Sequence, residues 1–183
     1  MIKRICNEFG YRLNLNIIPE EIYIDSFENL RNIRITLFDN KSKVSFYYYC
    51  NINNVNGYHI EMICSGDYPF RSPKNIYVNY NSYNNKINFD NETKKFVEKR
   101  YDVICTCCES ISCGNNWHPM FKIKYIIDEK YFWDNLLVRR MNLNIIRKNK
   151  NNIPSDLWNI IEDYIFYNKD DYQTMKRTGK YII

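Results

Sequence analysis

The sequence contains little glycine or proline and no long apolar segment. Its 183 residues include five Gly and five Pro, too few for a flexible linker rich in them. No apolar run approaches the ~18 residues that a membrane helix needs. The N-terminal Met-Ile-Lys-Arg-Ile-Cys also lacks the long apolar core of a signal peptide. We therefore expect a cytoplasmic protein of one domain, or of one domain with a tail, and no membrane partner.

The net charge of +5 is scattered along the chain. The densest basic cluster lies at residues 139–150. A nucleic-acid-binding face would combine basic residues with aromatic side chains that stack on bases. The cluster instead favours the solvated face of a helix, and we expect no nucleic-acid partner.

Seven cysteines are present, which is an odd number, and four of them fall within residues 105–113. The disulfide framework of a secreted protein is not spaced in this way. We therefore expect a reducing compartment and thiols that are not joined in disulfides. The remaining three cysteines lie on apolar stripes and are expected in the core: Cys6, Cys50 and Cys64.

The first half of the chain has the pattern of a helix followed by strands. An apolar stripe over residues 1–9 predicts a helix that Gly10 ends. Several runs then alternate between apolar and polar residues, which is typical of half-buried strands. Short polar turns between them, such as residues 39–42 and 53–57, indicate an antiparallel meander. The runs are 33–37, 44–50, 58–64 and a shorter one at 76–80, and Ile22 and Ile24 suit the start of an earlier strand.

The second half of the chain is predicted to be irregular and then helical. Residues 81–104 have weak periodicity and are expected to follow the surface without regular structure. Helical spacing begins near Pro119, and after a polar break a last amphipathic helix begins with Ser155 as its N-cap. The tail from residue 168 has no assigned structure. Helices beside an antiparallel sheet make an α+β fold.

Two motifs in this order carry a family resemblance. Tyr-Pro-Phe-Arg-Ser-Pro at residues 68–73 directly follows the third strand of the meander, and the thiol cluster precedes Trp-His-Pro at residues 117–119. With the N-terminal helix, these motifs resemble the ubiquitin-conjugating enzymes over about residues 1–135. The crowded cysteines are similar to those of divergent viral members from giant DNA viruses, which implies the host cytoplasm.

The resemblance implies a fold and a division of the chain. The fold is a UBC-like α+β domain, with an N-terminal helix, a four-stranded antiparallel meander, an irregular Cys-bearing segment and C-terminal helices. This domain would span residues 1–148, and a C-terminal helical extension would span residues 149–183. The Tyr-Pro turn alone would be weaker support, because non-catalytic RWD domains share it.

The resemblance also implies a reaction and its partners. In the family one cysteine accepts ubiquitin as a thioester and passes it to a lysine amine, and no cofactor is needed. Cys108, nine residues before Trp117, is the implied acceptor, with Cys107 and Cys105 as alternates. The implied partners are ubiquitin or a ubiquitin-like modifier, an activating enzyme and a ubiquitin ligase.

The chain departs from the family pattern at one catalytic element. The family has a His-Pro-Asn segment about ten residues before its cysteine, and this sequence contains no His-Pro-Asn. The asparagine is thought to support the oxyanion, and loss of one such donor typically costs ~10²–10³ in rate. Asn116, or its neighbour Asn115, is the candidate substitute. We expect a transferase whose activity depends on this substitution.

The resemblance implies two partner-binding surfaces. A ligase would contact Phe70, Trp117 and Pro119, while the activating enzyme would contact Lys3 and Arg4 on the first helix. The two prolines that flank Phe70 make a rigid turn that can hold its ring outward, although a core position suits the ring equally well. Trp117 is also expected to pack the cysteine loop against the domain.

Two other interpretations of these residues are open. A catalytically inactive UBC- or RWD-like adaptor that binds ubiquitin or a ligase would need no oxyanion donor. A zinc-stapled binding module would use Cys105, Cys108, Cys113 and His118, whose spacing resembles that of a zinc knuckle. Without a metal, His118 is expected as an exposed turn residue or as a proton acceptor near the thiol.

Overall fold

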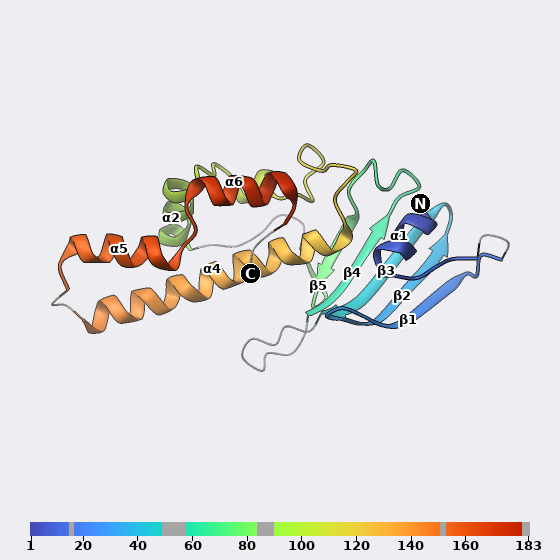
Figure 1. The fold of residues 1–183 in the computed structure, drawn as a ribbon, viewed down its shortest axis with the longest axis horizontal. Helices are drawn as coiled ribbons and strands as arrows, with labels where there is room; N and C mark the ends of the chain where they lie inside the picture. The colour runs from blue at the N-terminus through green and yellow to red at the C-terminus, as the bar shows by residue number, and fades with distance from the viewer. Residues whose placement is uncertain (15–16, 49–57, 84–89, 151–152, 181–183) are drawn as a thin grey trace. The chain divides into compact units, whose positions relative to one another are not determined.

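A computed structural model describes residues 1–14, 17–48, 58–83, 90–150 and 153–180 (Figure 1). For Tyr48, Thr106 and Cys107 only the backbone is described. An antiparallel sheet and helices are present, which confirms the predicted α+β class. The chain divides into two compact units, and each is described by itself. Unit 1 comprises Met1–Lys86 and Ser112–Ile123, and unit 2 comprises Ile87–Ile111 and Lys124–Ile183.

Unit 1 contains one short helix and a six-stranded sheet whose strands lie in sequence order. The prediction of four strands is wrong. The strand at Ile22 shows little alternation because most of its side chains are exposed, and the last strand is a two-residue edge pairing without an apolar signal. The elements are α1 (Ile2–Glu8), β1 (Glu21–Phe27), β2 (Leu30–Phe38), β3 (Lys41–Tyr48), β4 (Tyr58–Cys64), β5 (Lys74–Val78) and β6 (Asn81–Ser82).

One face of the sheet forms the core of unit 1. Val44 and Phe46 of β3 lie opposite Met62 and Ile60 of β4, and all four side chains are buried. Helix α1 packs on this face, with the ring of Phe9 5.7 Å from that of Phe46 (Figure 1). The period of two therefore predicted the buried face correctly in the central strands.

Two sharp turns in unit 1 have local causes. Gly10 ends α1 as predicted, with φ +69°, and a Cβ atom there would lie 2.7 Å from the ring of Phe27. Asp39 and Asn40 both have positive φ, as a two-residue hairpin turn requires. The turn is therefore shorter than the predicted 39–42. Cys50 and the turn expected at residues 53–57 lie outside the described residues.

The described part of unit 2 is helical, and α4 begins at Ile123, the last residue of unit 1. The return of α5 along α4 is held by Glu162, which binds Arg140 at 3.2 Å and Arg147 at 2.9 Å (Figure 1). The domain boundary expected after residue 148 stays a prediction. No helix in the described residues is both long and apolar enough to cross a membrane. The helices are α2 (Asn91–Tyr101), α3 (Thr106–Glu109), α4 (Ile123–Asn149), α5 (Ser155–Ile165) and α6 (Lys169–Thr178).

Helix α2 lies in the segment that was expected to be irregular, so that prediction is wrong for residues 91–101. Asp90 caps the helix by accepting a 2.8 Å hydrogen bond from the backbone N–H of Thr93. Thr93, Val97 and Tyr101 form a buried stripe at i, i+4 spacing. Because the stripe is short and most other residues of α2 are polar, the helical periodicity could not be recognised in the sequence. Its burial depends on α6, because the ring of Tyr101 lies 4.8 Å from that of Tyr172.

The ends of the last two helices also refine the sequence interpretation. Ser155 is the first residue of α5, and Pro154 occupies the N-cap without a side-chain cap bond, so the predicted Ser155 cap is wrong. Helix α6 lies in the unassigned tail. Its N-cap Asn168 accepts a 2.8 Å bond from the N–H of Asp171, and Gly179 ends it in the left-handed conformation.

Candidate functional site

The Tyr-Pro motif forms a compact turn in unit 1, directly after β4. The N–H of Tyr68 donates to the carbonyl of Ser65 at 3.0 Å, and the N–H of Phe70 donates to the carbonyl of Asp67 at 2.7 Å. The Tyr68–Pro69 peptide bond is cis. Tyr68 is 2% exposed, whereas Phe70 is 77% exposed. The turn therefore buries its tyrosine and presents its phenylalanine.

A buried carboxylate holds this turn to α1 and to the start of α4. The side chain of Glu8 is 5% exposed, and its Oε1 accepts from the hydroxyl of Tyr68 at 2.6 Å and from Nε of Arg4 at 2.8 Å. Its Oε2 accepts from the backbone N–H of Ile123 at 2.9 Å. Burial, and then the negative charge of Glu8, raises the pKa of Tyr68 far above its ordinary value. The phenol thus stays protonated and donates to Glu8.

Trp117 connects the second motif to the first within unit 1. Its indole N–H donates to the carbonyl of Pro69 at 2.6 Å, and its ring centroid lies 6.0 Å from that of Tyr68. The ring meets Phe121 edge-on at 5.8 Å. Trp117 is 9% exposed, so it packs the turn, as the sequence suggested. Its predicted contact with a ligase stays a prediction.

Replacement of Trp117 by Phe is expected to lower the free energy of unfolding by about 1–2 kcal/mol, because the partly buried carbonyl of Pro69 loses its donor. Denaturant titration followed by circular dichroism measures the change. Trp158→Phe is the matched control, since that ring contacts Arg147 across its face and a phenyl ring keeps this contact. Equal effects of the two substitutions would contradict the role of the indole N–H.

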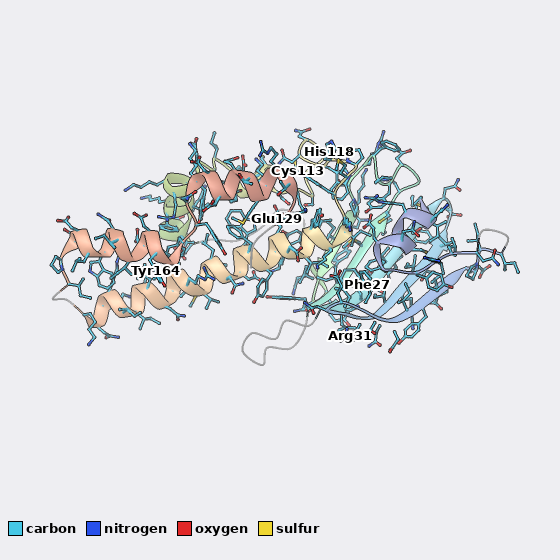
Figure 2. All side chains as sticks on the ribbon, viewed as in Figure 1. Phe27, Arg31, Cys113, His118, Glu129 and Tyr164 are labelled. Atoms are coloured by element: carbon cyan, nitrogen blue, oxygen red, sulfur yellow. The ribbon has the colours of Figure 1, made fainter. Side chains whose placement is uncertain are left out.

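An exposed apolar pair flanks the Trp117 hydrogen bond. Phe70 directly follows the acceptor residue Pro69, and Met120, which is 75% exposed, lies three residues after the donor Trp117. The sequence analysis did not identify Met120 as a surface residue of this site. Its position directly after Pro119, which was a predicted partner-binding residue, was the signal that could have identified it. Exposed His118 has its Nδ1 3.2 Å from the N–H of Met120, which donates to it. His118 is thus an exposed turn residue, as expected, and lies with Cys113 on the loop before α4 (Figure 2).

The implied acceptor thiol lies on a single helical turn in unit 2. The carbonyl of Cys105 accepts from the N–H of Cys108 at 3.1 Å and from the N–H of Glu109 at 3.0 Å. Cys108 is exposed, and Cys105 is half-buried. The side chain of the alternate Cys107 lies outside the described side chains. The expected irregular segment is therefore locally helical at its thiols. We call residues 105–111 the thiol turn.

The thiol turn is held by charged residues that the sequence analysis missed. Glu129 lies on α4 (Figure 2) and is fully buried. Its carboxylate accepts from the hydroxyl of Ser110 at 2.7 Å and from the N–H of Ile111 at 3.0 Å. Glu109 forms an ion pair with Lys176 of α6. The sequence did contain a signal for Glu129, which is a glutamate within the apolar run at the start of α4. A charged residue is rarely buried unless it is paired, so a glutamate in such a run indicates a carboxylate that binds partners.

The other predicted site residues belong mostly to unit 1. The guanidinium of Arg4 already has two partners within unit 1. Its Nε donates to Glu8, and its Nη2 donates to the carbonyl of Pro119 at 3.5 Å. Lys3 and Asn115 are exposed, and Asn116 is half-buried, with its N–H donating to the carbonyl of Cys113 at 2.9 Å. Unit 1 thus contains the predicted asparagines and partner residues, while unit 2 contains the predicted acceptor. Their catalytic and binding roles stay predictions.

The thiols differ in their surroundings. Burial raises the pKa of Cys6 to about 11 and raises that of Cys64 still further, so these two are the core cysteines that were expected. Among the described residues, no group of three His, Cys, Asp or Glu side chains is arranged to hold a metal ion. The four zinc candidates are divided between the units, with Cys105 and Cys108 in unit 2 and Cys113 and His118 in unit 1.

Comparison with known proteins adds no family to these observations. No protein-family model, curated protein or solved structure matches the chain.

Proposed function

We propose that this chain accepts ubiquitin or a ubiquitin-like modifier as a thioester on Cys108 and transfers it to a lysine amine, on a UBC-like fold. The observation that carries the proposal is an exposed cysteine on a turn that a buried carboxylate anchors. A helix followed by an antiparallel meander and a Tyr-Pro turn supports the fold. Strands β2 to β5 match the four predicted strands, and β1 and β6 would be additions to the family's four-stranded meander.

The reaction needs a thiolate that is accessible and held in one place. The Cys108 thiolate attacks the carbonyl carbon of the modifier's thioester on the activating enzyme, and the sulfur of that enzyme leaves as a thiolate. A neutral lysine amine then attacks the new thioester, an amide bond forms as the C–S bond breaks, the nitrogen loses a proton to water, and the Cys108 sulfur leaves as a thiolate. Both steps pass through an oxyanion, for which Asn116 or Asn115 is the proposed donor. No metal or redox step is involved.

The proposed partners meet surfaces of unit 1. The activating enzyme would contact α1 through exposed Lys3, while Arg4 is engaged with Glu8 and Pro119. A ligase would contact exposed Phe70 together with Met120, which extends the predicted apolar surface. Exposed apolar side chains beside a rigid, hydrogen-bonded turn are suited to anchor a partner.

Thioester formation tests the proposal directly. Incubation with activating enzyme, ATP and ubiquitin is expected to give an adduct on a non-reducing gel that thiol reagents remove. Cys108→Ala is expected to abolish the adduct, while Cys105→Ala, a matched change at the half-buried end of the same turn, is expected to keep it. If no adduct forms and wild type behaves like Cys108→Ala, the enzymatic proposal is wrong. Loss in Cys107→Ala alone would move the acceptor by one residue.

A non-catalytic adaptor is the second candidate, and the exposure of Phe70 and Met120 favours it. An adaptor would bind ubiquitin or a ligase through these side chains without forming a thioester. Binding of ubiquitin, measured by titration calorimetry, would then be lost in Phe70→Ala and retained in Cys108→Ala. Binding lost in neither variant would exclude this surface.

A further inference from the structure

The C-terminal helix contacts the thiol turn through a charged pair. Lys176 of α6 binds the carboxylate of Glu109, the residue directly after Cys108. The two side chains are only 22% and 23% exposed. Partly buried charges are screened less by water and salt than exposed ones, so this pair has more effect on position than a surface pair.

Helix α6 holds Lys176 in a defined place, because it is firmly packed in unit 2. Tyr172 and Met175 are buried, and the ring of Tyr172 lies 5.6 Å from Trp133 and 5.9 Å from Phe132 of α4. The helix is also capped at both ends by Asn168 and Gly179. Lys176 therefore extends from an anchored helix.

The thiol turn depends on such outside support. Helix α3 has four residues, and an isolated helix of that length is unstable. The reason is that the entropy lost when nucleation fixes the backbone dihedral angles exceeds the stabilisation from its few hydrogen bonds. Glu129 holds the turn after the thiol, at Ser110 and Ile111. Lys176 holds it at Glu109, one residue from the thiol. The turn thus has two anchors, from α4 and from α6.

We propose that Lys176 is a positioning residue that orients the thiol turn through Glu109, so that α6 is required for efficient loading of Cys108. The inference rests on the proposed role of Cys108 as the acceptor. Lys176 does not take part in the covalent steps. Its contribution is geometric, and misplacement of a reacting group by about 1 Å can lower a rate by about 100-fold.

Two measurements on the full-length chain test the inference. Lys176→Met is expected to slow thioester formation about tenfold, while alkylation of Cys108 by iodoacetamide, which needs no defined orientation, changes less than about twofold. Amide hydrogen exchange of residues 105–111 is expected to become about fivefold faster. Lys176→Arg keeps the charge and is expected to restore both rates to near wild type. Glu109→Gln is expected to reproduce Lys176→Met, with no further loss in the double variant.

Lys169→Met is the matched control. Lys169 lies on the same helix and forms a similar ion pair with Asp102 at 2.8 Å, but that pair is exposed and does not involve the thiol turn. Lys169→Met is expected to leave both thioester formation on Cys108 and amide hydrogen exchange of residues 105–111 unchanged. Unchanged exchange in Lys176→Met would overturn the inference, as would faster exchange with normal loading. If wild type forms no thioester but exchange still responds to Lys176, the anchoring by α6 holds and the proposed function fails.

Discussion

Replacement of Glu8 by Ala is expected to lower the free energy of unfolding of unit 1 by about 2–6 kcal/mol. The substitution leaves two buried groups without their acceptor, the hydroxyl of Tyr68 and the N–H of Ile123, and each such loss costs about 1–3 kcal/mol. Arg4 is partly exposed, so water replaces part of its contact with Glu8. The measurement is urea unfolding followed by circular dichroism.

Glu61→Ala is the matched control for Glu8→Ala. Glu61 forms one ion pair with Lys43 at 2.9 Å on the partly exposed side of the sheet. Pairs of this kind contribute about 0–1 kcal/mol, so the control is expected to stay near wild type. A loss below about 1 kcal/mol in Glu8→Ala, equal to that of Glu61→Ala, would show that the carboxylate does not hold the Tyr-Pro turn.

The second large expected effect is loss of stability at alkaline pH. Burial is the leading cause of a raised pKa at five described groups. The pKa of Cys6 is raised to about 11 and that of Tyr101 to about 12, and the pKa values of Cys64, Tyr68 and Tyr172 are raised further. These groups stay protonated in the folded chain when the unfolded chain has already lost its protons. Their contribution is therefore complete below about pH 9 and is lost as pH rises.

The expected loss begins near pH 9, the ordinary pKa of the cysteines, and steepens near pH 10, that of the tyrosines. Each group that ionises only in the unfolded chain lowers stability by about 1.4 kcal/mol per pH unit. Denaturation midpoints measured between pH 7.5 and 10.5 test this slope. A midpoint that stays constant over this interval would contradict the burial of these groups.

Tyr172→Phe separates ionisation from packing in the same experiment. The hydroxyl of Tyr172 is buried and has no hydrogen-bond partner among the described residues, so its removal is expected to be neutral or stabilising at pH 7.5. It is also expected to make the alkaline slope shallower. Tyr164→Phe is the control, because Tyr164 is 92% exposed, and it is expected to change neither quantity.

The elements that the sequence predicted correctly are those with a strong local period. Alternation in β2, β3 and β4 arises because one face of each strand is buried, and the apolar spacing of α4 arises in the same way. Helix α5 also has the predicted apolar spacing, but none of its residues is buried. Helix α2 was missed because few of its residues are apolar, and β1 was left open because most of its side chains are exposed. Their burial depends on neighbours distant in sequence, such as α6 against Tyr101.

The candidate site shows the same division. The thiol cluster and the two motifs stand out in the sequence because Cys, Trp and Pro occur there in unusual concentration. Glu8, Glu129 and Lys176 do not stand out, because a single charged residue on a helix is normally solvated. Only the folded chain shows that the carboxylates of Glu8 and Glu129 are buried and that their oxygens accept hydrogen bonds.

The sequence by itself determined the α+β class, the buried face of the central strands and the two motifs, because residue spacing along the chain controls each of these. The tertiary structure decided which side chains hold the motifs. Trp117 and Glu8 fasten the Tyr-Pro turn in unit 1, and Glu129 and Lys176 fasten the thiol turn in unit 2. The physical reason is that a hydrogen bond or ion pair between residues far apart in sequence exists only after packing has brought them together and removed competing water.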